Sequence, residues 1–198
     1  MTRSLTGLGL IAAGLLLAGC ASTQAATEPA SSVNATASSD NGTSSSAMAS
    51  GMDSTSEPSA SALMVCGNDI RGKVRQVLAL TSAPAASDGF ANGRYTCTYR
   101  LPPGPLVLSV QQSPSTTVAD RYFAEQRARL RGTSLPGLGT AAFGTATGTV
   151  VVVKDNETLT VDATGLPSVF GTQRQRRTDL AYEIASDVLG CWTGDGDE

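Results

Sequence analysis

Histidine is absent from this sequence of 198 residues, and its absence excludes several classes of active site. It is the side chain whose unperturbed pKa lies nearest neutrality, which suits it to acid–base catalysis and to metal binding. A Ser-His-Asp triad, a Cys-His pair and a histidine-ligated zinc centre are therefore excluded. Lysine is scarce as well, with Lys73 and Lys154 as the two residues of this type. Hydrolases that use a Ser-Lys pair or paired carboxylates are not excluded by these absences.

Charged residues are also few, and they are unevenly placed. The formal net charge is −3, and residues 21–60 contain four acidic residues but no Lys or Arg. Residues 61–198 contain thirteen basic and thirteen acidic residues, so this part of the chain is formally neutral. A neutral domain lacks the basic surface that nucleic-acid binding requires, and we expect no nucleic-acid partner.

The first nineteen residues have the order of a secretory signal peptide. Arg3 precedes an apolar stretch over residues 8–17, which is shorter than the about 20 residues that span a bilayer. The stretch ends in Leu17-Ala18-Gly19-Cys20, a lipobox, which predicts a diacylglyceryl group on Cys20 at the mature N-terminus. The alternative is ordinary cleavage near Ala18. Two acyl chains would hold the protein stably on the outer face of the cytoplasmic membrane.

The segment that follows Cys20 is dominated by Ser, Thr and Ala and shows no apolar periodicity. We expect residues 20–62 to form a lipidated, disordered tether, because such a sequence buries too little apolar surface to offset its chain entropy. As a flexible coil of about 40 residues it would reach roughly 35 Å. An acidic disordered tail is expected over residues 194–198.

Residues 63–193 predict a single α+β domain. Helical spacing of apolar residues predicts three helices, which begin at Asn68 or Asp69, at Thr117 and near Ala181. Alternation of apolar and polar residues, or a continuous apolar run, predicts strands over residues 95–101, 106–111, 141–143, 149–154 and 158–162.

The connections between these segments complete the predicted fold. Residues 81–93 are expected to form a loop, and the proline-rich residues 102–105 a wide turn. Helices segregated to one side of an antiparallel sheet give a two-layer α+β arrangement. We therefore expect an antiparallel sheet of four to five strands with about three helices packed on one side.

Three cysteines remain once Cys20 is lipidated, and an extracytoplasmic compartment favours one disulfide among them. Cys66 with Cys97 is the favoured pair, while Cys191 is an alternative partner for either residue. The cysteine left over is expected to be buried, since unbonded cysteine is among the most buried residue types.

Two further motifs favour structural roles. Residues 137–142 fit the G-x-G-x-x-A form of a dinucleotide fingerprint, but no strand precedes them and strand-like residues follow, which indicates a glycine turn. Asp155, Glu157 and Asp162 lie at or near a predicted hairpin tip, and we expect them to be solvated turn residues. No motif indicates a metal site or a cofactor.

Arg174, Arg176 and Arg177 cluster just before the last predicted helix. Cations are disfavoured at a helix N-terminus by the helix dipole, so this cluster needs another explanation. One interpretation is contact with an anion or a lipid headgroup, and the other is a solvated loop.

The chain resembles the small secreted lipoproteins of unassigned function that actinobacteria carry. The resemblance lies in the lipobox at Cys20, the Ser/Thr/Ala tether, Val65-Cys66, and three motifs at residues 95–99, 137–143 and 187–192. It covers residues 63–193 and implies no catalytic residue. Cys191 departs from the simpler members with two cysteines.

These features favour a non-enzymatic binding module of the cell envelope, anchored to the membrane through Cys20. Its partner would be an envelope protein or an amphiphilic ligand, and this hypothesis predicts an exposed apolar groove or patch. The alternative is an envelope-modifying enzyme that uses carboxylates or a Ser-Lys pair. A spacer without any ligand is a third hypothesis.

Overall fold

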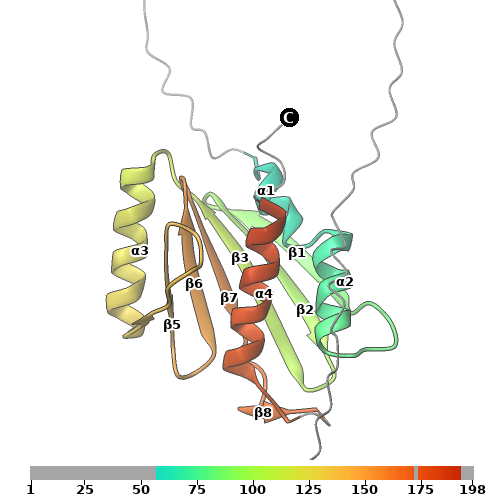
Figure 1. Cartoon of the computed structure of the whole chain (residues 1–198). Coiled ribbons are helices and arrows are strands. Elements are labelled where there is room, and N and C mark those ends of the chain that lie inside the picture. The colour runs from blue at the N-terminus through green and yellow to red at the C-terminus, as the bar shows by residue number, and fades with distance from the viewer. Residues whose placement is uncertain (1–56, 172–173, 193–198) are drawn as a thin grey trace, which may run out of the picture. The chain divides into compact units, whose positions relative to one another are not determined.

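Turn chemistry and strand alternation determine the topology of the central sheet. In the computed structural model, which describes residues 57–171 and 174–192, seven antiparallel strands have the order β1-β2-β3-β7-β6-β5-β4 (Figure 1). They are β1 Ala85–Ala91, β2 Arg94–Leu101, β3 Gly104–Gln112, β4 Thr133–Ser134, β5 Ala141–Gly144, β6 Thr149–Lys154 and β7 Glu157–Asp162. A separate hairpin consists of β8 Val169–Phe170 and β9 Gln175–Arg176. The predicted signal peptide, Cys20, most of the predicted tether and the acidic tail lie outside the described residues.

Helices cover both faces of this sheet. They are α1 Ala60–Met64, α2 Asn68–Val77, α3 Thr116–Leu130 and α4 Arg177–Trp192. Two hydrophobic cores lie on opposite faces of β6. Val150 and Val152 belong to the core that includes α1, α2 and α4. Val151 and Val153 instead pack with Phe123 of α3.

The α+β class, the antiparallel sheet and the strands from β5 to β7 are confirmed, but the strand count and the helix placement are wrong. The sheet has seven strands instead of four to five, and α3 packs on the face opposite the other helices. A strand with four consecutive buried valines needs apolar cover on both faces, and α3 supplies the second cover. The two-layer prediction missed this requirement.

The predicted loop over residues 81–93 contains strand β1. Asn92 and Gly93 have φ values of 53° and 69°, the left-handed conformation that a two-residue type I′ hairpin turn requires. The wide turn predicted over residues 102–105 is also wrong, because Leu101 pairs directly with Gly104. Pro102 and Pro103 alone therefore form the tip of the β2–β3 hairpin.

Residues 59–64, which include helix α1 and which we call the N-terminal segment, contact the rest of the domain. Residues 60–62, which the sequence placed in the tether, are helical, and Ala62 is fully buried. The Trp192 indole Nε1 donates a hydrogen bond to the Ser61 carbonyl (3.1 Å), and the Ser59 hydroxyl donates to the buried Glu157 carboxylate (2.5 Å). These contacts fix the start of the domain to α4 and β7.

The predicted Cys66–Cys97 disulfide is present and attaches the segment between α1 and α2 to β2. The buried Tyr99 hydroxyl, two residues along the same strand, donates a hydrogen bond to the Val65 carbonyl (2.6 Å). Burial raises the pKa of Tyr99 above its ordinary value of 10, so the hydroxyl remains a donor even in mildly alkaline solution. Cys191 is buried in α4 and takes no part in this disulfide.

We expect replacement of both Cys66 and Cys97 by alanine to lower the free energy of unfolding by about 3–4 kcal/mol. The disulfide closes a loop across 31 positions, and opening it restores chain entropy to the unfolded state. Guanidinium unfolding of the native and variant chains measures the difference, with Cys191→Ala as the cysteine control. Equal midpoints for the double variant and the native chain would contradict this prediction.

Candidate functional site

One end of the sheet gathers the segments that form two cavities. The start of β3, the end of β7 and the start of β6 lie at the same end of the sheet. The strand register shows this, because Asp162 of β7 pairs with Val107 of β3 on one side and with Thr149 of β6 on the other. The β8–β9 hairpin follows β7 in the chain and leads into α4. Both cavities therefore lie beside the start of α4 and the hairpin before it.

The first cavity, which we call the apolar groove, has a volume of about 520 Å³. Its walls come from residues 77–80 after α2, from residues 101–103 at the β2–β3 tip, and from Phe170, Gly171 and Gln175 of the β8–β9 hairpin. Gln175 is the one polar side chain among the described residues that line it.

Backbone geometry keeps the first wall of the groove in place. Helix α2 ends at Val77, and the Leu80 amide donates a hydrogen bond back to the Arg75 carbonyl (2.9 Å). Ala79, between these positions, has a φ of 49°, so the chain reverses within one residue. Val77, Leu78 and Leu80 are each only partly buried and pack against the main core, so part of each faces solvent.

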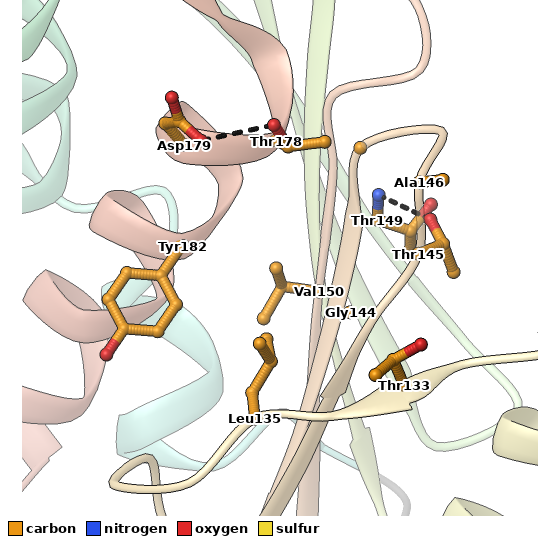
Figure 2. Close-up of a pocket in the computed structure, with 11 residues that line it drawn as sticks. Thr133, Leu135, Gly144, Thr145, Ala146, Thr149, Val150, Thr178, Asp179 and Tyr182 are labelled. Atoms are coloured by element: carbon orange, nitrogen blue, oxygen red, sulfur yellow. Dashed lines mark hydrogen bonds between the residues drawn. The ribbon is translucent and has the colours of Figure 1, made fainter.

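The second cavity, which we call the α4 pocket, has a volume of about 400 Å³. Figure 2 shows Tyr182 of α4 on one side, Leu135 and Val150 in the middle, and Thr145 and Thr149 on the other side.

The rim of the α4 pocket is polar. The Thr178 hydroxyl donates a hydrogen bond to the Asp179 carboxylate (3.2 Å), and the Thr145 hydroxyl accepts one from the Thr149 amide (3.0 Å). Among the described residues that line the pocket, Asp179 is the one charged residue. The pocket therefore combines an apolar floor, a half-exposed aromatic ring and a rim of hydroxyl and carboxylate oxygens.

The arginine cluster does not come together as one anion site. The Arg177 guanidinium donates hydrogen bonds to the carbonyls of Thr164 (3.2 Å) and Leu166 (2.8 Å), which fix the first residue of α4 to the loop after β7. Arg174 and Arg176 are exposed and flank Gln175, whose side chain lines the groove. Gln175 and Arg176 are neighbours in β9, and neighbouring residues of a strand point to opposite faces, so Arg176 points away from the groove. Arg174 precedes the strand in a turn, with a φ of 51°. Anion contact remains a prediction.

The carboxylates near the β6–β7 tip have different environments. Asp155 is exposed and lies 3.1 Å from the Lys154 ammonium, as a solvated turn residue should. Asp162 is half-buried and accepts a hydrogen bond from the Thr164 amide (2.9 Å). Glu157 is buried against Ser59, so its predicted solvent exposure is wrong. The glycine turn is confirmed at Gly137 and Gly139, which have positive φ values, and it leads into β5 at Ala141. The short strand β4 precedes it, although no strand was predicted there.

A carboxylate pair on α4 was not predicted from the sequence. Partial burial raises the pKa of Glu183 above its ordinary value of 4.5, and the charge of Asp187 raises it further. Partial burial also raises the pKa of Asp187 above 3.8, against the opposing influence of the Lys73 ammonium. Their spacing of one helical turn was visible in the sequence, but burial next to α2 was not.

Comparison with protein-family models, with curated proteins and with solved structures finds no match for this chain. Among the described residues, no helix has the length and apolar character needed to cross a membrane. The same part of the chain contains no group of three or more Cys, Asp or Glu side chains that could hold a metal ion.

The raised pKa values predict a pH dependence of stability. The folded chain binds protons at Glu183 and Asp187 more tightly than the unfolded chain, so stability falls as pH rises from the ordinary values through the raised ones. We expect Asp187→Asn to flatten this dependence and to raise the unfolding midpoint at pH 7. Urea unfolding across a pH series measures both effects. The exposed control Glu125→Gln should keep the native dependence, and an Asp187→Asn chain that also keeps it would refute the prediction.

Proposed function

We propose that this protein is a lipid-anchored extracytoplasmic binding module, and that its apolar groove holds the acyl chain of an amphiphile. The observation that carries the proposal is the composition of the groove, since nine of the ten described residues that line it are apolar. Exposed apolar surface of this kind is costly to leave in water unless a partner covers it. The volume also falls within the range of small-molecule sites.

The chemistry of the lining favours an uncharged, flexible chain as the occupant. Among the described residues that line the groove none is charged, so these residues offer no partner to an ionic group. Leu78, Leu80 and Leu101 provide aliphatic walls that a methylene chain can contact along its length. Each buried CH₂ would contribute about 0.8 kcal/mol. The polar head of the amphiphile would remain in solvent at the open side.

The predicted anchor supports the same ligand class. Thirty-six residues separate Cys20 from the first described residue, and as a flexible coil they would reach about 33 Å. The domain would therefore stay near the membrane surface, where amphiphiles are concentrated. The resemblance to small actinobacterial lipoproteins agrees with this location.

The alternative function is an enzyme that modifies envelope material with carboxylates. Raised pKa values at Glu183 and Asp187 are typical of acid–base residues, and this observation favours the alternative. Neither residue lines the groove or the α4 pocket. The binding hypothesis therefore explains the apolar groove, which the enzyme hypothesis leaves without a role.

A fluorescent fatty acid tests the groove directly. We expect the full mature chain with Cys20→Ala to bind dansyl-labelled undecanoic acid, with a blue shift and an increase in dansyl emission. Pro103→Asp places a carboxylate in the groove wall and should weaken binding at least about tenfold, because a charge is costly to desolvate beside an alkyl chain.

Pro114→Asp is the matched control for this experiment. Pro114 is exposed and follows the opposite end of β3, so the same substitution there should leave binding unchanged. Circular dichroism establishes that both variants fold. Absence of binding to the native groove, or equal binding by Pro103→Asp, would refute the proposal.

The anchor is tested separately by membrane fractionation. We expect the native chain to sediment with membranes, and the Cys20→Ala chain to be recovered in the soluble fraction because it has no diacylglyceryl group. Mass spectrometry of the N-terminal peptide should show the lipid on Cys20. Equal distribution of both chains, together with an unmodified Cys20, would instead support ordinary cleavage near Ala18.

A further inference from the structure

We propose that the α4 pocket is a saccharide-binding site. This proposal concerns a different cavity from the groove and does not rest on the function proposed above. Three observations carry it: the exposure of Tyr182, the apolar floor below its ring and the uncharged hydroxyls on the rim. Tyr182 retains 42% of its accessible surface, and it is one of three large apolar or aromatic residues exposed to this degree among those described.

The apolar floor and the Tyr182 ring are suited to contact the C–H face of a sugar ring. A pyranose presents C–H groups on its faces and hydroxyl groups around its edge. Leu135 and Val150 form an apolar floor, and the ring of Tyr182 lies beside them (Figure 2). A tyrosine ring provides rigid contact area with little entropy loss, because few torsions become fixed.

The rim suits the hydroxyl groups of the same ligand. The carboxylate of Asp179 accepts hydrogen bonds only, and a sugar hydroxyl is a suitable donor. Bonds of this kind to a charged acceptor are stronger than those between neutral groups. The hydroxyl of Thr133 can donate or accept, and the hydroxyl of Thr178, which donates to Asp179, can still accept a hydrogen bond from a sugar hydroxyl.

The same lining disfavours ions as ligands. Among the described residues that line the pocket none is cationic, and the guanidinium of Arg177, which packs against Gly148 at its edge, is bonded to the carbonyls of Thr164 and Leu166. A phosphate or carboxylate group would therefore find little opposite charge there. One carboxylate with scattered hydroxyls provides too few anionic oxygens for a calcium site, which takes six to eight oxygen ligands. An uncharged polyhydroxylated ligand remains as the class that fits.

The pocket is held in place before any ligand arrives. The two carbonyl contacts of Arg177 fix the first turn of α4, which carries Asp179 and leads to Tyr182. Gly148 has a φ of 97°, and a Cβ at this position would lie 2.8 Å from the Arg177 Cγ, so α4 packs closely on the β5–β6 loop. A preformed site loses less free energy to ordering when it binds.

Saturation-transfer-difference NMR on the full mature Cys20→Ala chain tests the proposal. The probes are the methyl glycosides of glucose, galactose, mannose, arabinose and N-acetylglucosamine at millimolar concentration. We expect at least one glycoside to receive saturation at its ring C–H protons. Tyr182→Ala should weaken its binding about tenfold, whereas Tyr182→Phe, which keeps the ring, should change it less than threefold.

The Asp179→Asn variant tests the contribution of the polar rim to binding separately from that of the Tyr182 ring. It keeps the side-chain shape but removes the charge, and we expect binding to weaken at least fivefold. Asp120→Asn in the first turns of α3 is the matched control and should bind as the native chain does. No binding of any of the five glycosides, or native affinity in both Tyr182→Ala and Asp179→Asn, would overturn the proposal. Circular dichroism and guanidinium unfolding verify that each variant is folded.

Discussion

Burial of one face of α4 against β6, β7 and α2 is the interaction on which the rest of this structure depends. The buried residues of this helix extend from Leu180 to Trp192, so its whole length is held on the sheet. Its start, fixed by Arg177, forms one wall of the α4 pocket, and its end holds the Ser61 carbonyl through Trp192. The Cys66–Cys97 disulfide adds a covalent constraint on the same side of the sheet. A change that loosened α4 would therefore disturb both cavities and the attachment of the N-terminal segment.

The sequence predicted those parts of the fold in which the spacing of apolar residues matches the buried positions of a helix or strand. The hairpin of β6 and β7 has the predicted bounds within one residue, and the apolar positions of α4 from Ala181 to Trp192 are all buried. Cys97 alternates with the buried Tyr95 and Tyr99 on β2, which placed it on the inner face where Cys66 could reach it. Local pattern sufficed in these cases because the spacing of the apolar residues matches the faces of each helix or strand that are buried.

The remaining parts depended on contacts between distant segments. Strand β1 consists of Ala, Ser, Asp, Gly and Phe, which have little strand preference as a group, and pairing with β2 through the Asn92-Gly93 turn makes it a strand. The apolar run of β6 indicated that this strand is buried on both faces. The sequence did not show that α3 is the helix that covers the second face. The apolar groove joins three segments that lie up to about a hundred positions apart, so no local motif could have shown it. The arginine cluster, by contrast, was visible in the sequence, but Arg177 is used for structure.

The groove as an acyl-chain site is the central claim, and paramagnetic NMR tests it most directly. A stearic acid that carries a nitroxide on its chain would be titrated into the isotope-labelled Cys20→Ala chain, and the loss of each backbone amide signal measured. The account predicts selective loss at residues 77–80 and 101–103, reversed when the nitroxide is reduced. Uniform loss over the whole surface, or selective loss at residues 116–130 of α3 on the opposite face of the sheet, would contradict it.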